Sequence, residues 1–97
     1  MKNMTLNNIA IACRGKLFTQ STIGESEVKG VVIDSRLIEK DFLFIATRGE
    51  KVDGHDYIEA ASSQGAIAVI CERAPSNKTI SYILVEDSLL ALKDIAS

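Results

Sequence analysis

The chain has 97 residues, of which 46% are hydrophobic and 25% are charged, and its net charge at pH 7 is -2. This composition is typical of one small globular domain and excludes a disordered chain. It provides no general attraction for nucleic acid or an anionic membrane, so we expect neither as a partner. No stretch approaches the roughly 20 apolar residues that span a bilayer, and the first residues form no secretory signal, so we expect a cytoplasmic protein.

The first predicted element is an amphipathic helix over residues 5–14. Thr5 is placed to cap its start, and Gly15 is placed to end it in the left-handed C′ position. The apolar positions recur at helical spacing: Leu6, Ile9, Ala10 and Cys13. The polar stretch that follows contains short apolar pieces at Leu17-Phe18 and Ile23, which we expect to pair as a small hairpin.

Four apolar runs predict strands. They cover residues 31–33, 41–46, 66–71 and 81–86, and the first three are continuous enough to be buried strands. A helix is predicted to begin at His55 and to end at Gly65. Its inner face is formed by Tyr57, Ile58 and Ala61.

A last helix follows the fourth strand. Asp87 or Ser88 is expected to cap it. Its predicted inner face is formed by Leu89, Leu92 and Ile95. The helix reaches Ser97 without an ending signal, so we expect a fragment of a longer protein.

Strands that alternate with helices predict an α/β domain, with a mixed, mostly buried sheet of four to five strands flanked by helices. The connection between Asp34 and Phe42 is shorter than the dozen or more residues of a usual crossover between parallel strands, which is why we expect a mixed sheet. Cys13 and Cys71 lie far apart, each within an apolar pattern. We expect both to be reduced core thiols.

The first candidate functional motif is I-D-S-R, Ile33 to Arg36, which directly follows a predicted strand. In one interpretation Asp34 and Ser35 accept backbone hydrogen bonds in a turn and Arg36 is solvated. In the other, the motif binds a ligand, because ligands of α/β sheets bind beyond strand ends and a hydroxyl beside an arginine suits a phosphate or carboxylate. Both interpretations stay open at this point.

The second motif is R-G-E-K-V-D-G-H-D-Y, from Arg48 to Tyr57. Asp53-Gly54 is a turn dipeptide, and an aspartate near a helix start complements the helix dipole. The motif also carries more donors than a cap needs: Arg48, Lys51 and His55. Gly49 and Gly54 would let the backbone approach a ligand closely.

The chemistry expected of the chain itself is binding rather than catalysis. His55 is the only histidine, and no metal site is expected around it. Neither Ser35 nor His55 lies in a recognisable nucleophile context. The sequence also lacks the G-x-x-x-x-G-K-[ST] loop that cradles ATP phosphates.

The run from Val31 to Glu72 resembles the N-terminal domain of the Mur ligases, the ATP-dependent amide ligases that build the peptidoglycan peptide. The family's pattern is an apolar strand ending in D-S-R, a second strand, G-E-x-x-D-G-H-D-F, a helix and G-A-x-A-x-x, and this chain follows it with Tyr57 at the phenylalanine position. The opening M-T-L-N-N-I-A-I-A-C-R-G-K-L is most similar to the members that add D-alanyl-D-alanine, the MurF type. The members that add the third amino acid remain the alternative.

This resemblance implies an intact three-domain enzyme that uses ATP and Mg²⁺ to phosphorylate the terminal carboxylate of UDP-N-acetylmuramoyl-tripeptide. The amine of D-alanyl-D-alanine then attacks the acyl phosphate. ATP and Mg²⁺ would bind to a domain outside residues 1–97, and this domain, expected to be monomeric, would hold the UDP end of the substrate. The substrate-binding residues expected on this basis are Ser35, Arg36, Arg48, Gly49, Glu50, Lys51, Asp53, Gly54 and His55.

Two features of this chain conflict with a simple transfer of the family's pattern to it. Where the family has P-G-D before its second strand, this chain has Lys40, Asp41 and Phe42, so a different turn is expected. A tight hairpin between the two strands would also send the two motifs to opposite ends of the sheet, whereas the resemblance implies that they converge. A free-standing nucleotide-sugar-binding module and a structural domain without a ligand are the remaining alternatives.

Overall fold

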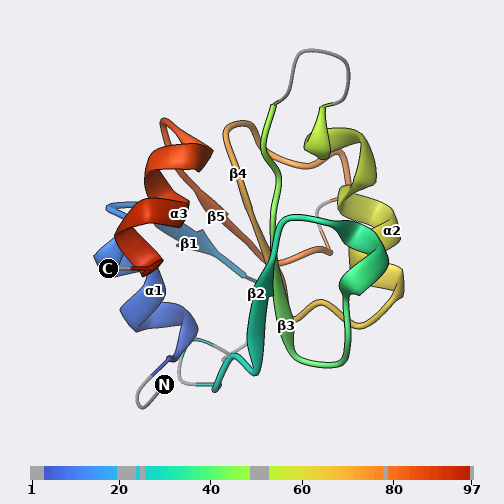
Figure 1. Cartoon of the computed structure of the whole chain (residues 1–97), viewed down its shortest axis with the longest axis horizontal. Helices are drawn as coiled ribbons and strands as arrows, with labels where there is room; N and C mark the ends of the chain where they lie inside the picture. Colours follow the sequence, from blue (N-terminus) through green and yellow to red (C-terminus); the bar gives the residue numbers. More distant parts are fainter. Residues whose placement is uncertain (1–3, 20–23, 25, 49–52, 78, 97) are drawn as a thin grey trace.

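A computed structural model of the chain describes residues 4–19, 24, 26–48, 53–77 and 79–96. A sheet lies between two helical layers (Figure 1). Its strands are β1 (Lys16–Phe18), β2 (Gly30–Val32), β3 (Phe42–Ile45), β4 (Ala68–Cys71) and β5 (Tyr82–Leu84). The helices are α1 (Leu6–Ala12), α2 (Ile58–Ser63) and α3 (Ser88–Ala96), with the short 3₁₀ helices η2 (Ser35–Leu37) and η3 (Gly54–Tyr57). Within the described residues, no helix is long and apolar enough to cross a bilayer.

The strand order is β1-β5-β4-β3-β2, which confirms the predicted mixed α/β sheet. The antiparallel pair, however, is β1 with β5, and β2 runs parallel to β3. The expectation that the connection after Asp34 is too short for a crossover was therefore wrong. Because β2 has three residues, the chain must return only about 10 Å along the sheet. The single turn of η2 and its flanking residues cover that distance.

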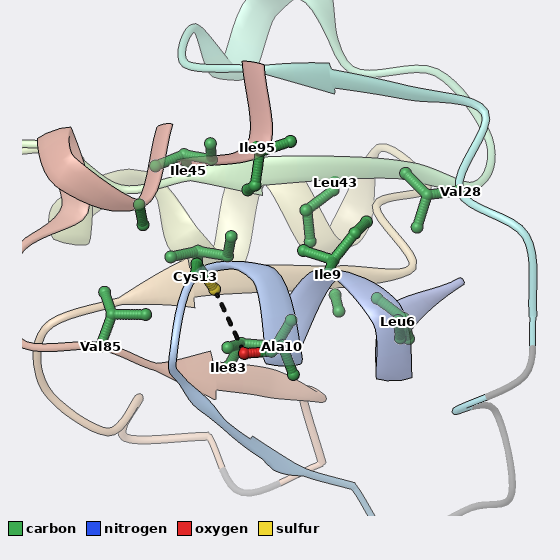
Figure 2. Close-up of a cluster of buried hydrophobic side chains, with 13 residues drawn as sticks. Leu6, Ile9, Ala10, Cys13, Val28, Leu43, Ile45, Ile83, Val85 and Ile95 are labelled. Atoms are coloured by element: carbon green, nitrogen blue, oxygen red, sulfur yellow. Dashed lines mark hydrogen bonds between the residues drawn. The ribbon is translucent and has the colours of Figure 1, made fainter. Parts of the chain in front are cut away.

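β3 and β4 form the centre of the domain because their side chains alternate between two hydrophobic clusters. Leu43 and Ile45 of β3 lie in the cluster under α1 and α3, whereas Phe44 faces the cluster under α2. Figure 2 shows the first cluster, in which Ile9 of α1 and Ile95 of α3 meet the sheet. Both faces are covered, which explains why these strands appear in the sequence as continuous apolar runs.

The end of α1 differs from the prediction. Thr5 caps its start as expected, accepting a hydrogen bond of 3.2 Å from the Asn8 N–H. At the other end Arg14, not Gly15, has the left-handed conformation, with φ of 59°. The Gly15 N–H instead donates to Ala10 O, the longer hydrogen bond of a Schellman ending. Gly15 is needed because a Cβ there would lie 2.5 Å from Ile83 Cγ2 of β5.

The structure also differs from the prediction at several strand positions. β2 is only partly buried because it is an edge strand, and Ile33 beyond it is 51% exposed. Leu17 and Phe18 belong to β1 and pair with β5. Their expected hairpin partner, Ile23, lies outside the described residues.

The inner faces of two helices were predicted with one error each. Leu89 is exposed, whereas Ile95 is buried as predicted and Ala91 is buried beside it. Ile58 and Ala61 of α2 are buried as predicted, but Tyr57 is 44% exposed. Tyr57 belongs to the 3₁₀ helix η3, which precedes α2, so the helix predicted from His55 becomes α-helical only at Ile58.

The two cysteines are reduced and buried, as predicted. Burial raises the pKa of Cys13 above its usual value, and burial raises the pKa of Cys71 to about 11. Both thiols therefore remain protonated at neutral pH. Each makes only a weak hydrogen bond, from Sγ of Cys13 to Ala10 O and from Sγ of Cys71 to Ile83 O. The first of these is drawn in Figure 2.

Candidate functional site

The parallel pairing of β2 and β3 brings the two motifs to the same edge of the sheet. D-S-R follows the carboxyl end of β2, and the second motif follows the carboxyl end of β3. A cavity of about 570 Å³ lies between them. It is lined by Ile33, Asp34, Ser35, Arg36, Phe44, Thr47, Gly54 and Tyr57. Ser35, Arg36 and Gly54 thus share one cavity, so the motifs converge as the resemblance implies.

One wall of the cavity is the D-S-R turn. The Asp34 carboxylate caps η2 by accepting the Arg36 N–H at 2.9 Å, and it also pairs with the Arg36 guanidinium, Nη2 to Oδ2, at 2.7 Å. The side-chain hydrogen bonds from Arg36, followed by its backbone N–H, lower the pKa of Asp34 to about 2. The turn interpretation is therefore correct for Asp34. The Arg36 side chain remains 86% exposed, so its other N–H groups can reach a ligand.

The facing wall begins at Gly54. Its N–H donates to Thr47 O at 2.7 Å, which joins the start of η3 to the residues following β3. A Cβ at Gly54 would lie 2.8 Å from Thr47 N and 2.9 Å from Thr47 O. Backbone atoms cannot shift as easily as the end of a side chain, so this close approach requires glycine. Tyr57, at the end of η3, adds a half-exposed aromatic ring to the same wall.

His55 does not line the cavity, because its side chain is turned into the protein and is only 3% exposed. Nε2 lies 2.8 Å from the Glu72 N–H and accepts its hydrogen bond, so Nε2 carries no proton. The proton is then on Nδ1, which donates to Asp53 Oδ1 at 2.7 Å. In this arrangement the imidazole is neutral and its two nitrogens are both engaged, which leaves neither to act as a base on a ligand.

Asp53 and Arg48 are likewise engaged with neighbouring groups. Asp53 accepts hydrogen bonds from the His55 N–H at 2.9 Å and from Arg73 Nη2 at 2.9 Å. These two contacts, together with the His55 ring, hold the pKa of the Asp53 carboxyl well below its usual range. Arg48 pairs through Nε with Glu72 Oε1 at 2.9 Å. Asp53 and Arg48 also form an isolated antiparallel bridge with each other.

The predicted substrate residues therefore separate into three groups. Ser35, Arg36 and Gly54 line the cavity. Arg48, Asp53 and His55 contact other parts of the protein, and as contacts of a ligand they stay predictions. The remaining predicted residues, Gly49, Glu50 and Lys51, lie outside the described part of the chain.

Sequence reasoning missed the residues that hold the second motif in place. Glu72 and Arg73 directly follow β4, much as D-S-R follows β2. D-S-R was identified in the sequence because charged residues come just after a predicted buried strand. The same signal would have identified Glu72 and Arg73. Thr47, which also lines the cavity, carries no comparable signal in the sequence, and Tyr57 lies in the second motif but was expected on the inner face of the helix.

The chemistry available here is recognition of an anionic ligand with a flat or apolar part. The cavity offers a serine hydroxyl, an exposed guanidinium and an aromatic ring. In the described ranges, no group of three or more His, Cys, Asp or Glu side chains is arranged to hold a metal ion.

Comparisons with known proteins identify the family. The sequence model described as "Mur ligase family, catalytic domain" matches residues 27–96. The UDP-N-acetylmuramoyl-L-alanyl-D-glutamate--2,6-diaminopimelate ligase of Bacteroides thetaiotaomicron is 49% identical over 73 residues, which cover 73% of this chain and 15% of that protein. The UDP-N-acetylmuramoyl-tripeptide--D-alanyl-D-alanine ligase of Bacillus subtilis is 36% identical over 98 residues, which cover 99% of this chain and 21% of that protein.

The fold comparison agrees with the sequence comparisons. A crystal structure of MurF from Acinetobacter baumannii superposes with a TM-score of 0.83 at 29% identity, over 93% of this chain and 19% of that chain. The chain thus spans only 15% to 21% of the length of the curated relatives named above. Together these likenesses show that the chain belongs to the Mur ligase family, with the fold of the family's N-terminal domain.

Proposed function

We propose that this chain is the substrate-binding N-terminal domain of a cytoplasmic, monomeric Mur ligase that joins D-alanyl-D-alanine to UDP-N-acetylmuramoyl-tripeptide. The cavity of about 570 Å³ would hold the uridine diphosphate end of that substrate. The observation that carries the proposal is the convergence of Ser35, Arg36 and Gly54 on this one cavity, because these residues come from the two motifs of the family pattern. Gly49, Glu50 and Lys51 are included in the site on the resemblance alone.

The lining residues suit the two parts of a uridine diphosphate. The Tyr57 ring provides a face against which a flat base can stack, and the buried Phe44 contributes apolar surface beside it. The Arg36 guanidinium can donate to the diphosphate while Asp34 keeps it oriented through the pairing at 2.7 Å. The Asp34 charge offsets part of that attraction, so Ser35 and backbone N–H groups must supply the remaining hydrogen bonds.

The chemical step is proposed to take place outside these residues. ATP and Mg²⁺ would be bound by another domain, since this sequence has no phosphate-binding loop of the G-x-x-x-x-G-K-[ST] type. Binding energy gathered at the uridine diphosphate end would then position the distant carboxylate of the peptide for reaction. Substitutions in this cavity are therefore expected to change both affinity and turnover of the intact enzyme.

A second candidate is the ligase that adds the third residue to UDP-N-acetylmuramoyl-L-alanyl-D-glutamate. Its support is the higher identity to the diaminopimelate ligase, 49% over 73 residues. The D-alanyl-D-alanine reaction is favoured because the likeness to that ligase covers 99% of the chain, including the opening helix. Phosphate release by the longer enzyme, measured with each substrate pair in turn, separates the candidates: only the correct pair supports turnover.

The direct test of the proposed site is titration of the chain with UDP-N-acetylmuramoyl-tripeptide by calorimetry. Arg36→Ala removes a charged donor, so affinity is expected to fall by roughly tenfold or more. Lys16→Ala removes an equal charge from β1, at the opposite edge of the sheet from β2, and is expected to leave affinity unchanged. Equal affinities for wild type and Arg36→Ala would contradict the site assignment.

A further inference from the structure

We propose that Glu72 and Arg73, acting through His55, are positioning residues for the substrate cavity. The two residues follow β4 and contact the second motif at its first residue, Arg48, and at residues 53–55. In this way they fix where Gly54 and Tyr57 stand as the cavity wall. The inference rests on the proposed function, because the cavity is taken to be the substrate site.

Glu72 contributes three separate contacts. Its backbone N–H donates to His55 Nε2 at 2.8 Å, and one carboxylate oxygen, Oε1, accepts from Arg48 Nε at 2.9 Å. The other oxygen, Oε2, accepts the Ser88 N–H at the start of α3, also at 2.9 Å. One residue therefore ties the second motif to the end of β4 and to α3.

Arg73 completes the arrangement on the other side. Its Nη2 donates to Asp53 Oδ2 at 2.9 Å, while Asp53 Oδ1 accepts from both the backbone N–H and the ring Nδ1 of His55. The Asp53 carboxylate thus links the His55 ring to Arg73. We name the set of Arg48, Asp53, His55, Glu72 and Arg73 the β4 clamp.

Burial indicates which contacts of the β4 clamp matter most. The side chains of Arg48 and Arg73 are 63% and 58% exposed, and exposed ion pairs contribute little. The His55 ring is only 3% exposed, so its loss would leave the Glu72 N–H without its partner and would remove one of the donors to the Asp53 carboxylate. The contact of His55 with Glu72 is therefore expected to dominate, with Arg73 as support.

The β4 clamp acts on the cavity through the chain rather than by contact. None of its members lines the cavity, yet His55 directly follows Gly54, whose N–H is bonded to Thr47 O at 2.7 Å. With the ring released, the start of η3 would keep the Gly54 contact and the exposed pairing of Asp53 with Arg73, but it would lose its buried link to the end of β4. Gly54 and Tyr57 would then take up several positions, and a ligand would have to order them on binding.

The test measures affinity and local order in the same variants. His55→Ala removes the contact with Glu72, and affinity for UDP-N-acetylmuramoyl-tripeptide is expected to fall roughly fivefold or more. Hydrogen exchange of the Gly54 N–H should quicken in the same variant. His55→Gln can still accept the Glu72 N–H, so it should recover part of both properties. Arg73→Lys should likewise retain more affinity than Arg73→Ala.

The matched control is Ile70→Val, which lowers stability from the cluster under α1 and α3, on the sheet face away from η3. It should lower the melting temperature without changing affinity or Gly54 exchange. If His55→Ala binds as tightly as Ile70→Val, the positioning role is overturned while the proposed function stands. If the wild type shows no binding at millimolar substrate, the proposed function itself fails and the positioning role fails with it.

Discussion

Gly54 gives the sharpest prediction about the cavity wall. In Gly54→Ala the new Cβ would meet Thr47 N at 2.8 Å, Thr47 O at 2.9 Å and Ala46 Cα at 3.0 Å. All three are backbone atoms following β3, so the strain cannot be relieved by a side-chain rotation. Overpacking of this kind costs about 1–3 kcal/mol. For a domain of this size each kcal/mol lowers the melting temperature by about 4–8 °C, so a cost of about 2 kcal/mol corresponds to about 8–16 °C.

Thermal unfolding followed by far-ultraviolet circular dichroism measures this shift. Gly24→Ala is the matched control, because the three atoms nearest to a Cβ there all belong to the side-chain amide of Asn7, with Oδ1 at 2.6 Å, and none is a backbone atom. The control is expected to lower the melting temperature by less than half as much. A Gly54→Ala protein that melts within about 2 °C of wild type would refute the close approach of η3 to β3.

Three further predictions concern caps and titrating groups. Ser88→Ala should leave stability unchanged or raise it, because the buried Ser88 hydroxyl has no hydrogen-bond partner in the described structure. Asp87→Ala should cost about 1 kcal/mol, because it removes the cap that accepts the Leu89 N–H. Chemical denaturation measures both, and a larger loss of stability in Ser88→Ala would contradict the assignment of Asp87 as the cap. Asp34 has a folded pKa of about 2, below its usual 3.8, so its contribution to stability is fully present above pH 3.8 and is lost as pH falls toward 2. Carboxyl ¹³C shifts should titrate accordingly and return toward 3.8 in Arg36→Ala. With its pKa raised to about 11 by burial, Cys71 should react with a disulfide reagent at pH 8 only when the protein unfolds, and rapid labelling of the native protein would contradict its burial.

The elements best predicted from sequence were those whose burial is decided locally. β3 and β4 are covered on both faces, so their apolar runs identified them without knowledge of their neighbours. The Thr5 cap was likewise predictable because its partner, the Asn8 N–H, is three residues away. The direction of β2 relative to β3, in contrast, is not decided locally. The length of the connection before Phe42 was compared with the length of usual crossovers between parallel strands, and the sequence did not show that β2 would be so short.

The candidate site shows the same limit. The motifs themselves located Ser35, Arg36 and Gly54, but their convergence was expected only from the family resemblance. His55 was expected to contact the ligand because it falls on the second motif of the family pattern, and that expectation stays a prediction. The structure shows that its Nε2 accepts the backbone N–H of Glu72, seventeen positions along the chain, and no pattern in the sequence marks a backbone group as a partner.

The most direct test of the account is to map substrate binding on the ¹⁵N-labelled chain by NMR. Addition of UDP-N-acetylmuramoyl-tripeptide at millimolar concentration should shift the amide signals of Ser35, Arg36, Gly54 and Tyr57, all of which line the proposed cavity. UDP alone should shift the same signals, since the uridine diphosphate end is the part proposed to bind. Shifts confined to Val28, Val31 and Leu92, which line a separate cavity of about 410 Å³, or no shifts at all, would contradict the account.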